Sequence, residues 1–313
     1  MSTETTAVPK PVLRPGDRIF RGASTGAGIA ILVLLALVAA FLIYQAWPAL
    51  VADGSDVRGG KGLVAYIAPL AFGTVLSAVI ALLIATPLSI GIALFISHYA
   101  PRRLATPLGY VVDLLAAVPS VIFGLWGFAV LARGSVPVQQ FLNEHLNWIP
   151  FFGGDGAASD GRSMLVVGTV LAIMILPIMT AVNREVFLQT PRLHEEASLA
   201  LGATRWEMFK QAVIPFGRSG VISGMMLGLG RALGETMAVA ILLSPGEAYS
   251  MELLTNNSSS TIAADIALNF PESSGLEVNT LVASGMVLFV ITLAVNMLAR
   301  WIVSRRSEFS GAN

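Results

Sequence analysis

Residues 62–101 read GLVAYIAPLAFGTVLSAVIALLIATPLSIGIALFISHYAP and contain no Asp, Glu, Lys or Arg. A hydrocarbon core about 30 Å thick is crossed by about 20 helical residues, because a helix rises about 1.5 Å per residue. The stretch is therefore long enough for one transmembrane helix and a lead-in segment that ends near Pro69. A helix is expected because an open strand would leave its backbone N–H and C=O groups without partners in lipid.

Five further apolar runs lie on either side of this stretch. The run within residues 22–52 carries no Asp, Glu, Lys or Arg, and it is longer than the 7–15 apolar residues usual in a cleaved signal peptide. We therefore interpret it as a retained span. The other four runs are residues 106–131, 163–183, 219–243 and 279–303. The sequence predicts an all-α integral membrane protein with six transmembrane helices.

The composition supports this fold class and excludes several functions. Of the 313 residues, 55% are hydrophobic and 12% are charged, and the formal net charge is zero. This balance does not suit a disordered chain or a nucleic-acid-binding protein. The absence of Cys excludes disulfides and thiolate metal sites. The three His residues are scattered and no motif of a metal site or catalytic triad accompanies them, so neither metal binding nor catalysis is expected.

The basic residues predict the orientation of the helices. With the N-terminus inside, the inner segments carry fourteen Lys and Arg residues and the outer loops carry four. Because basic residues favour the cytoplasmic side, both termini are expected there. Including the acidic residues gives the inner segments a net charge of +7 and the outer loops −6. The two long outer segments, 133–162 and 244–278, are rich in Gly, Ser, Asn and acidic residues, which predicts surface loops.

The inner loop before the fifth span has helical periodicity of its own. Apolar residues recur at helical spacing on both sides of Gly202, where one short helix would end and the next begin. Pro215 is expected to stop the second helix. The pattern predicts a helix–turn–helix under the membrane with an exposed acidic end. It is equally typical of a helix pair lying in the headgroups or of the floor of the helix bundle.

Two opposite charges lie inside the predicted fifth span. Arg231 is about 18 Å from the start of that span, and Glu235 follows four residues later, on the same face of a continuous helix. Charges at this depth are costly and usually face a pathway or a partner. One interpretation is a guanidinium offered to an anionic substrate, because the planar fork of Arg suits a tetrahedral oxyanion. The other is an ion pair that only fixes helix packing.

Glycines repeat every four residues along the same predicted span. Small residues at this spacing allow another helix to approach closely. That helix would belong either to a partner subunit or to the same chain. The residues are Gly220, Gly224, Gly228, Gly230 and Gly234.

The third predicted span contains a proline near its middle. Pro119 removes a backbone hydrogen bond, so a kink is expected. Ser120 would then be placed to line a pathway, although a kink that serves packing alone is the alternative reading.

The inner loop resembles a motif of a known family. Glu196-Ala197-Ser198, Gly202 and Pro215 match the EAA loop of ABC importer permeases, whose pattern is E-A-A-x-x-x-G-x9-I-x-L-P, with Ser198 in place of the second Ala. The resemblance implies a type I ABC importer permease fold, in which this loop forms coupling helices that dock on a cytoplasmic ATPase subunit. The chain has no G-x-x-x-x-G-K-[ST] loop of its own, so ATP and Mg²⁺ are expected at that partner.

Three other segments resemble the permeases of phosphate-specific importers, namely Gly16 to Phe20, Ala116 to Gly127 and Arg231 to Ala240. The last segment reads R-A-L-G-E-T-M-A-V-A, which is similar to the PstC type rather than to the sister PstA type with its G-E-T-A-P. The resemblance implies that Arg231 and Glu235 act in phosphate movement. It also implies a bacterial inner-membrane complex with a sister permease, two ATPase subunits and an extracytoplasmic phosphate-binding protein. The negative outer loops fit delivery by such a protein, because they would repel a free anion.

On this reading the chain divides into four parts. They are a cytoplasmic tail (1–21), the first transmembrane helix with its outer loop (22–68), the ABC permease transmembrane domain (69–303) with its coupling loop (187–218), and a second cytoplasmic tail (304–313).

Two alternatives to phosphate import by an ABC complex remain open. A permease for sulfate or molybdate would use the same guanidinium. A proton-coupled secondary transporter would use Glu235 as its proton carrier, although no inverted repeat is visible in the sequence.

Overall fold

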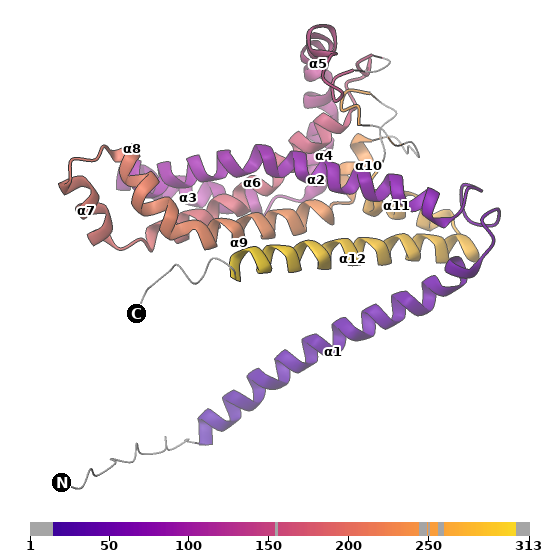
Figure 1. Cartoon of the computed structure of the whole chain (residues 1–313), viewed down its shortest axis with the longest axis horizontal. Helices are drawn as coiled ribbons and strands as arrows, with labels where there is room; N and C mark the ends of the chain where they lie inside the picture. Colours follow the sequence, from indigo (N-terminus) through magenta and orange to yellow (C-terminus); the bar gives the residue numbers. More distant parts are fainter. Residues whose placement is uncertain (1–14, 154–155, 244–248, 250, 256–259, 305–313) are drawn as a thin grey trace.

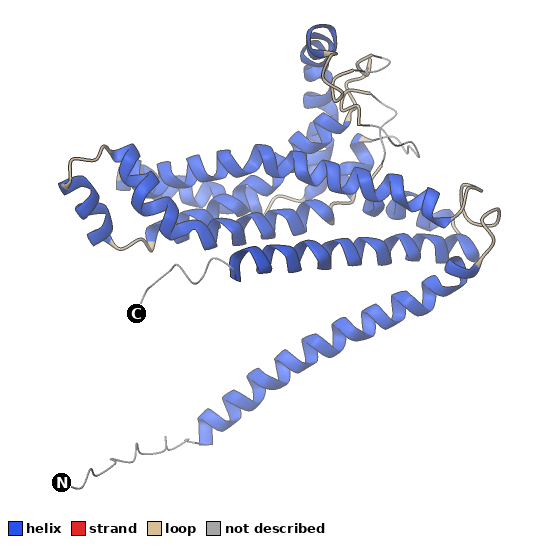
Figure 2. Ribbon diagram, in the orientation of Figure 1, coloured by secondary structure: helices blue, strands red, loops and turns tan. Residues whose placement is uncertain are grey.

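The computed structural model describes residues 15–153, 156–243, 249, 251–255 and 260–304. Every regular element among these residues is a helix (Figure 2). Six helices are long and apolar enough to cross a membrane, which agrees with the predicted number of spans. They cover residues 15–51, 63–99, 120–146, 164–188, 205–233 and 276–302.

Three helices form the core of the bundle. They are α2 (Leu63–Leu94), α6 (Met164–Leu188) and α9 (Ile214–Leu233). Helix α6 is the most buried span because it is apolar on almost every side and is packed between the other two. Gly168 allows α2 to approach it, since a Cβ at that position would lie 2.3 Å from Cγ2 of Ile80. Helix α2 continues through Pro69, so the expected lead-in segment is part of the helix.

Helix α1 (Pro15–Val51) diverges from the bundle (Figure 1). None of the side chains in its most apolar window is buried, and only Ala46 and Ala49 near its outer end join the core. Its apolar surface is therefore free to meet lipid or another subunit. The helix begins at Pro15, six residues before the expected end of the cytoplasmic tail, because Pro suits a first helical turn and Asp17 follows in that turn.

The third crossing differs from the expected single helix over residues 106–131. Helix α3 (Arg102–Ala116) ends before Pro119, and α4 (Ser120–Trp126) begins after it. A π-helical segment η2 (Gly127–Ala132) and α5 (Arg133–Leu146) then extend the helix well into the predicted outer loop. The proline thus breaks the helix rather than bending it, because Ala117 to Pro119 leave the regular hydrogen-bond ladder.

The fifth crossing differs at both ends. Helix α8 (Arg205–Met208), the π-helical segment η3 (Phe209–Val213) and α9 form one continuous helix, so Pro215 does not stop the second helix of the inner loop. The π-helical bond from Ile214 N–H to the carbonyl of Phe209 closes the turn just before Pro215. Helix α9 ends at Leu233, and the short α10 (Met237–Leu242) follows after a three-residue break.

The described parts of the two long outer segments contain helices, in contrast to the predicted surface loops. Helix α11 (Ile262–Asn269) is followed by a 3₁₀ turn η4 (Phe270–Glu272), and its first residues are buried in the bundle. The hydroxyl of Tyr66 donates to Asp265 at 2.5 Å, and Ile262 N–H donates to Thr74 Oγ1 at 3.0 Å. The two long outer segments also bond each other, because Ala158 N–H donates to the carbonyl of Leu254. In the second of these segments, Ser258 and Ser259 lie outside the described residues.

Both ends of the described chain lie on one side of the bundle. Figure 1 shows the start of α1, the end of α12 (Leu276–Ser304) and α7 (Arg192–Ala200) at the same end. This arrangement is the one expected when the termini and the inner loop share the cytoplasmic side. The predicted tails themselves, residues 1–14 and 305–313, lie outside the described residues.

Candidate functional site

Arg231 lies in the last turn of α9, at the break in the fifth crossing. It is about 20 Å along the helix from Arg218, which is exposed at the inner end. The side chain of Arg231 is half-buried. Within the described residues, no carboxylate lies within 4.0 Å of its guanidinium and no hydrogen bond joins it to another group. A cation without an internal partner inside an apolar bundle is a candidate ligand for an anion.

Glu235 does not lie on the same helix face as Arg231, in contrast to the expectation. Helix α9 ends at Leu233 with Gly234 as its C-cap, and Glu235 lies in the break. Its carboxylate is 7% exposed and accepts a hydrogen bond from Ala238 N–H at 3.1 Å. Glu235 therefore caps the start of α10, and it leaves the charge of Arg231 uncompensated. The predicted pairing at i and i+4 fails because it requires a helix that Gly230 and Gly234 favour less than most residues do.

The break after α9 lies beside the break after α3. A Cβ at Gly124 of α4 would lie 2.8 Å from the Cα of Ala238, and one at Gly127 would lie 3.4 Å from Cδ2 of Leu242. Helices α4 and α10 therefore run in the same direction in close contact. Ser120 begins α4 directly after the first break, and Gly234 to Thr236 form the second break directly before α10. The structure thus brings the three predicted pathway residues to neighbouring helix breaks.

Helix α10 is fixed at its other end by Arg162. The Nε–H of Arg162 donates to the carbonyl of Leu242 at 3.1 Å, and Nη2 donates to that of Ile241 at 3.3 Å. The guanidinium also lies 5.6 Å from the ring centroid of Phe128. The last carbonyls of α10 are satisfied in this way, so the short helix is held at both ends.

The glycines of α9 pack mainly on α6 of the same chain. A Cβ at Gly220 would lie 2.2 Å from Val186, one at Gly224 would lie 3.1 Å from Asn183, and one at Gly228 would lie 2.9 Å from Met179. These three contacts favour the second alternative, packing within the same chain, at this part of the stripe. Among the described residues, a Cβ at Gly230 would meet no neighbouring atom within 4 Å, and one at Gly234 would meet only the carbonyl oxygen of Gly230, at 3.5 Å.

The inner loop forms the expected helix–turn–helix around Gly202. Helix α7 buries none of its residues, and Glu196 and Ala197 are exposed. Gly202 has φ of +87°, and it lies at the turn where Gly202 N–H donates to Leu199 and Ala203 N–H donates to Ser198. This pair of bonds is a Schellman motif, which favours Gly at its left-handed position.

The next helix begins with a capping box that sequence reasoning missed. Thr204 Oγ1 accepts from Glu207 N–H, while Thr204 N–H donates to Glu207 Oε2 at 2.7 Å. The signal was present in the sequence as a Thr followed three residues later by a Glu.

Replacing Thr204 with Ala is expected to loosen the start of α8. Loss of an N-cap hydroxyl costs about 1 kcal/mol, so the amides of the first turn should exchange with deuterium about fivefold faster. Hydrogen exchange with mass spectrometry measures this rate. Thr204→Ser is the matched control, because it keeps the hydroxyl and should exchange like the native chain. Equal exchange in Thr204→Ala and the native chain would contradict the capping role.

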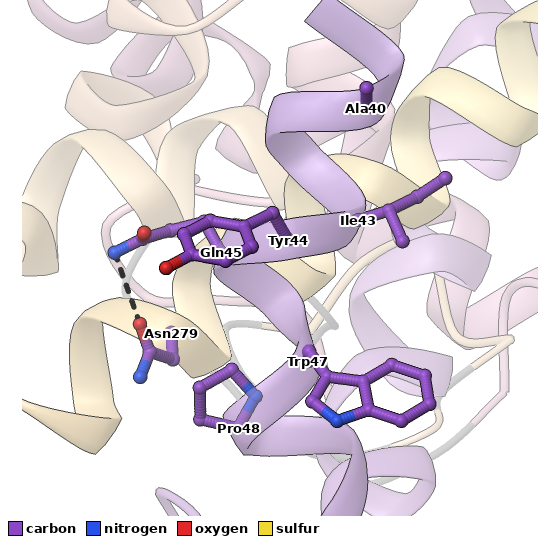
Figure 3. Close-up of a pocket in the computed structure, with 7 residues that line it drawn as sticks. All are labelled: Ala40, Ile43, Tyr44, Gln45, Trp47, Pro48 and Asn279. Atoms are coloured by element: carbon purple, nitrogen blue, oxygen red, sulfur yellow. Dashed lines mark hydrogen bonds between the residues drawn. The ribbon is translucent and has the colours of Figure 1, made fainter.

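A cavity of about 700 Å³ lies apart from these residues, between α1 and α12. Figure 3 shows its lining and the hydrogen bond of 3.2 Å from Gln45 Nε2 to Asn279 Oδ1. The lining is largely apolar and aromatic, and it contains no charged residue. It therefore offers an anion no cationic partner. Its residues are Ala40, Ile43, Tyr44, Gln45, Trp47, Pro48 and Asn279.

Residues 85–308 match the family described as the binding-protein-dependent transport system inner membrane component. This match covers more than half of the chain. The chain belongs to this family. The matched region of the permease begins in the middle of α2 and includes both helix breaks, the inner loop and α12.

Named relatives confirm the resemblance over nearly the whole permease. The chain is 44% identical in sequence to the phosphate transport system permease protein PstC 2 of Mycobacterium tuberculosis, over 92% of this chain and 91% of the relative. It is also 44% identical to the phosphate transport system permease protein PstC of Mycobacterium leprae, over 96% and 97% of the two chains. Among solved structures, a bacterial alginate ABC transporter in complex with a pentasaccharide-bound periplasmic protein has a TM-score of 0.61 at 15% identity, covering 95% and 97% of the two chains. This last likeness concerns the fold, which is that of ABC importer permeases.

Proposed function

We propose that this permease moves inorganic phosphate across the bacterial inner membrane, as one of two related subunits that form a pathway between them. The observation that carries the proposal is the guanidinium of Arg231, which has no partner among the described residues and lies at a helix break deep in the bundle. The names of the relatives support phosphate as the anion.

The chemistry at this break suits a transient anion site. The guanidinium of Arg231 is a cation that donates hydrogen bonds in pairs, so it suits a tetrahedral oxyanion. Glu235 is bonded to α10 and does not neutralise this charge. Ser120 begins α4, and its hydroxyl would add one neutral donor. One cation with few further donors favours passage over tight binding.

ATP hydrolysis takes place on partner subunits in this proposal, and ATP and Mg²⁺ bind there rather than to this chain. The exposed α7 and the turn that follows it would dock on the ATPase, and large apolar side chains on this surface remain uncovered. Leu193 is 75% exposed, Leu201 is 90% exposed and Trp206 is 62% exposed. At the other face, a phosphate-binding protein would deliver the anion past the negative outer loops. Helix α1 supplies apolar surface for lipid and for the sister permease of the PstA type.

Transport by the reconstituted complex tests the substrate and the energy source. Proteoliposomes that contain both permeases, the ATPase and the binding protein should accumulate labelled phosphate only when ATP is supplied to the ATPase side. An excess of sulfate or molybdate should leave this uptake unchanged, and so should a protonophore. Uptake of phosphate without ATP would instead indicate a proton-coupled transporter. Uptake of sulfate or molybdate at a similar rate would overturn the assignment to phosphate.

A further inference from the structure

Two π-helical segments meet beneath α7, at the inner end of α2. The segment η1 (Phe95–Tyr99) ends α2, and η3 lies between α8 and α9. The ring of Phe209 in η3 is 5.3 Å from the ring of His98 in an edge-to-face arrangement, and 5.3 Å from the ring of Tyr99. Phe209 is 1% exposed and packs in a cluster with residues of α2 and α6. Single π-helical turns occur frequently at functional sites, and here two of them share one contact.

Helix α7 is tied to this contact by one side chain. The Nε2–H of His98 donates to Oε1 of Glu195 at 3.3 Å, and the side chains of the two residues are 11% and 21% exposed. His98 is fixed on its other nitrogen, because Nδ1 lies 2.6 Å from Ser97 Oγ. In the part of the chain that the structure describes, this is the one side-chain hydrogen bond between α7 and another element.

The same end of α2 is contacted from the turn that follows α7. The guanidinium of Arg205, at the start of α8, lies 6.0 Å from the ring centroid of Tyr99. Three consecutive parts of the inner loop therefore converge on two neighbouring residues of η1, His98 and Tyr99. Helix α2 then runs into the main core, where it packs on α6. A displacement of α7 would reach the core by this route without passing through α9 first.

We propose that His98 is a positioning residue for transport, which joins α7 to α2 through Glu195 and through Phe209. The proposal rests on the proposed function, in that α7 is the element moved by the ATPase. In the complex, the contact of His98 with Glu195 and Phe209 makes the inner end of α2 move together with α7 during each ATP cycle. Without it, α7 moves with the ATPase while α2 lags, so ATP is hydrolysed without matching phosphate movement.

The test compares transport with ATP hydrolysis in the full complex. His98→Ala is expected to lower the number of phosphate ions moved per ATP about tenfold, because a hydrogen bond to a charged group is lost. Co-purification of the ATPase and its rate of hydrolysis should stay near native levels. Glu195→Ala should have a similar effect, and the double variant should be no worse than either single variant, since both remove one interaction.

Matched variants separate this role from simple loss of folding. Arg218→Gln changes an exposed side chain of α9 outside this contact and should transport normally. His98→Gln keeps an N–H donor toward Glu195 and should recover most of the ratio of phosphate to ATP. If His98→Ala keeps the native ratio of phosphate moved to ATP hydrolysed, the proposal is wrong. If its effects and those of Glu195→Ala add, the two residues do not act through one contact, and the proposal is also wrong.

Measurements on the native complex distinguish failure of this proposal from failure of the proposed function. If the native complex shows no ATP-driven phosphate uptake, both the proposed function and the proposed role of His98 are wrong. If the native complex takes up phosphate and His98→Ala keeps the native ratio of phosphate to ATP, only the proposed role of His98 is wrong.

Discussion

Replacing Arg231 with Gln is expected to lower ATP-driven phosphate uptake at least about thirtyfold. Removing one partner of a buried charge pair costs about 2–5 kcal/mol, and 1.4 kcal/mol corresponds to a factor of ten. The partner here is the passing anion, because Glu235 bonds Ala238 and no carboxylate among the described residues lies within 4.0 Å of the guanidinium. Initial rates of labelled phosphate uptake measure the effect, with the amount of complex in the membrane measured in parallel.

Two substitutions make this result specific. Arg231→Lys keeps the charge but loses the paired donors, so its uptake should fall between those of the native chain and Arg231→Gln. Arg218→Gln removes an exposed charge at the inner end of the same helix and should leave uptake near the native rate. Native uptake by Arg231→Gln at normal membrane levels would show that the guanidinium does not act on the substrate. Loss of the protein from the membrane would instead point to a structural role.

The same substitution also separates two readings of Glu235. If Arg231 and Glu235 formed a closed pair, Arg231→Gln would leave a buried carboxylate without its cation, and the protein would be destabilised. In the structure the carboxylate is held by α10, so the variant should retain its thermal stability. Thermal unfolding of the detergent-solubilised complex tests this expectation.

Most of the fold could be predicted because the bilayer imposes simple rules. Long apolar runs without charges must become helices in lipid, and residues 62–101 and the run that became α6 follow this rule closely. A proline has no fixed effect on such a run, because Pro87 and Pro177 lie inside continuous helices whereas Pro119 lies at a break. The sequence indicates that Pro119 disturbs the third crossing. Whether the helix bends or breaks there depends on the element that packs against it, which is α10 at Gly124.

The candidate site could be predicted only in part for a related reason. Arg231 was found because a charge in an apolar run is conspicuous, whereas the role of Glu235 depends on a break of three residues between α9 and α10. His98 was dismissed as one of three scattered histidines, since nothing local links it to Glu195, which lies 97 residues away in the chain. A contact between residues so far apart in the chain produces no periodicity or motif spacing in the sequence from which it could be predicted.

Replacing Gly202 with Val is expected to uncouple the permease from its ATPase. At φ of +87° a β-branched residue is strained by about 1–3 kcal/mol, so the Schellman turn should open and α7 should end in a different direction. Leu201, which is 90% exposed beside this turn, would then leave the proposed docking surface. We expect the ATPase to co-purify about tenfold more weakly and uptake to fall in proportion, as measured by pull-down and by phosphate uptake on the same membranes.

Gly202→Asn is the control for this turn, because Asn tolerates the left-handed conformation better than any β-branched residue. No atom of another element lies within 4 Å of a Cβ at this position, so the two substitutions differ in backbone strain rather than in packing. The Asn variant should therefore retain most of the ATPase, and the Val variant should lose it. Equal retention by both would show that the direction of α7 is not set by Gly202. Equal loss would show that the surface at residue 202 itself contacts the ATPase, since any side chain there would then interfere.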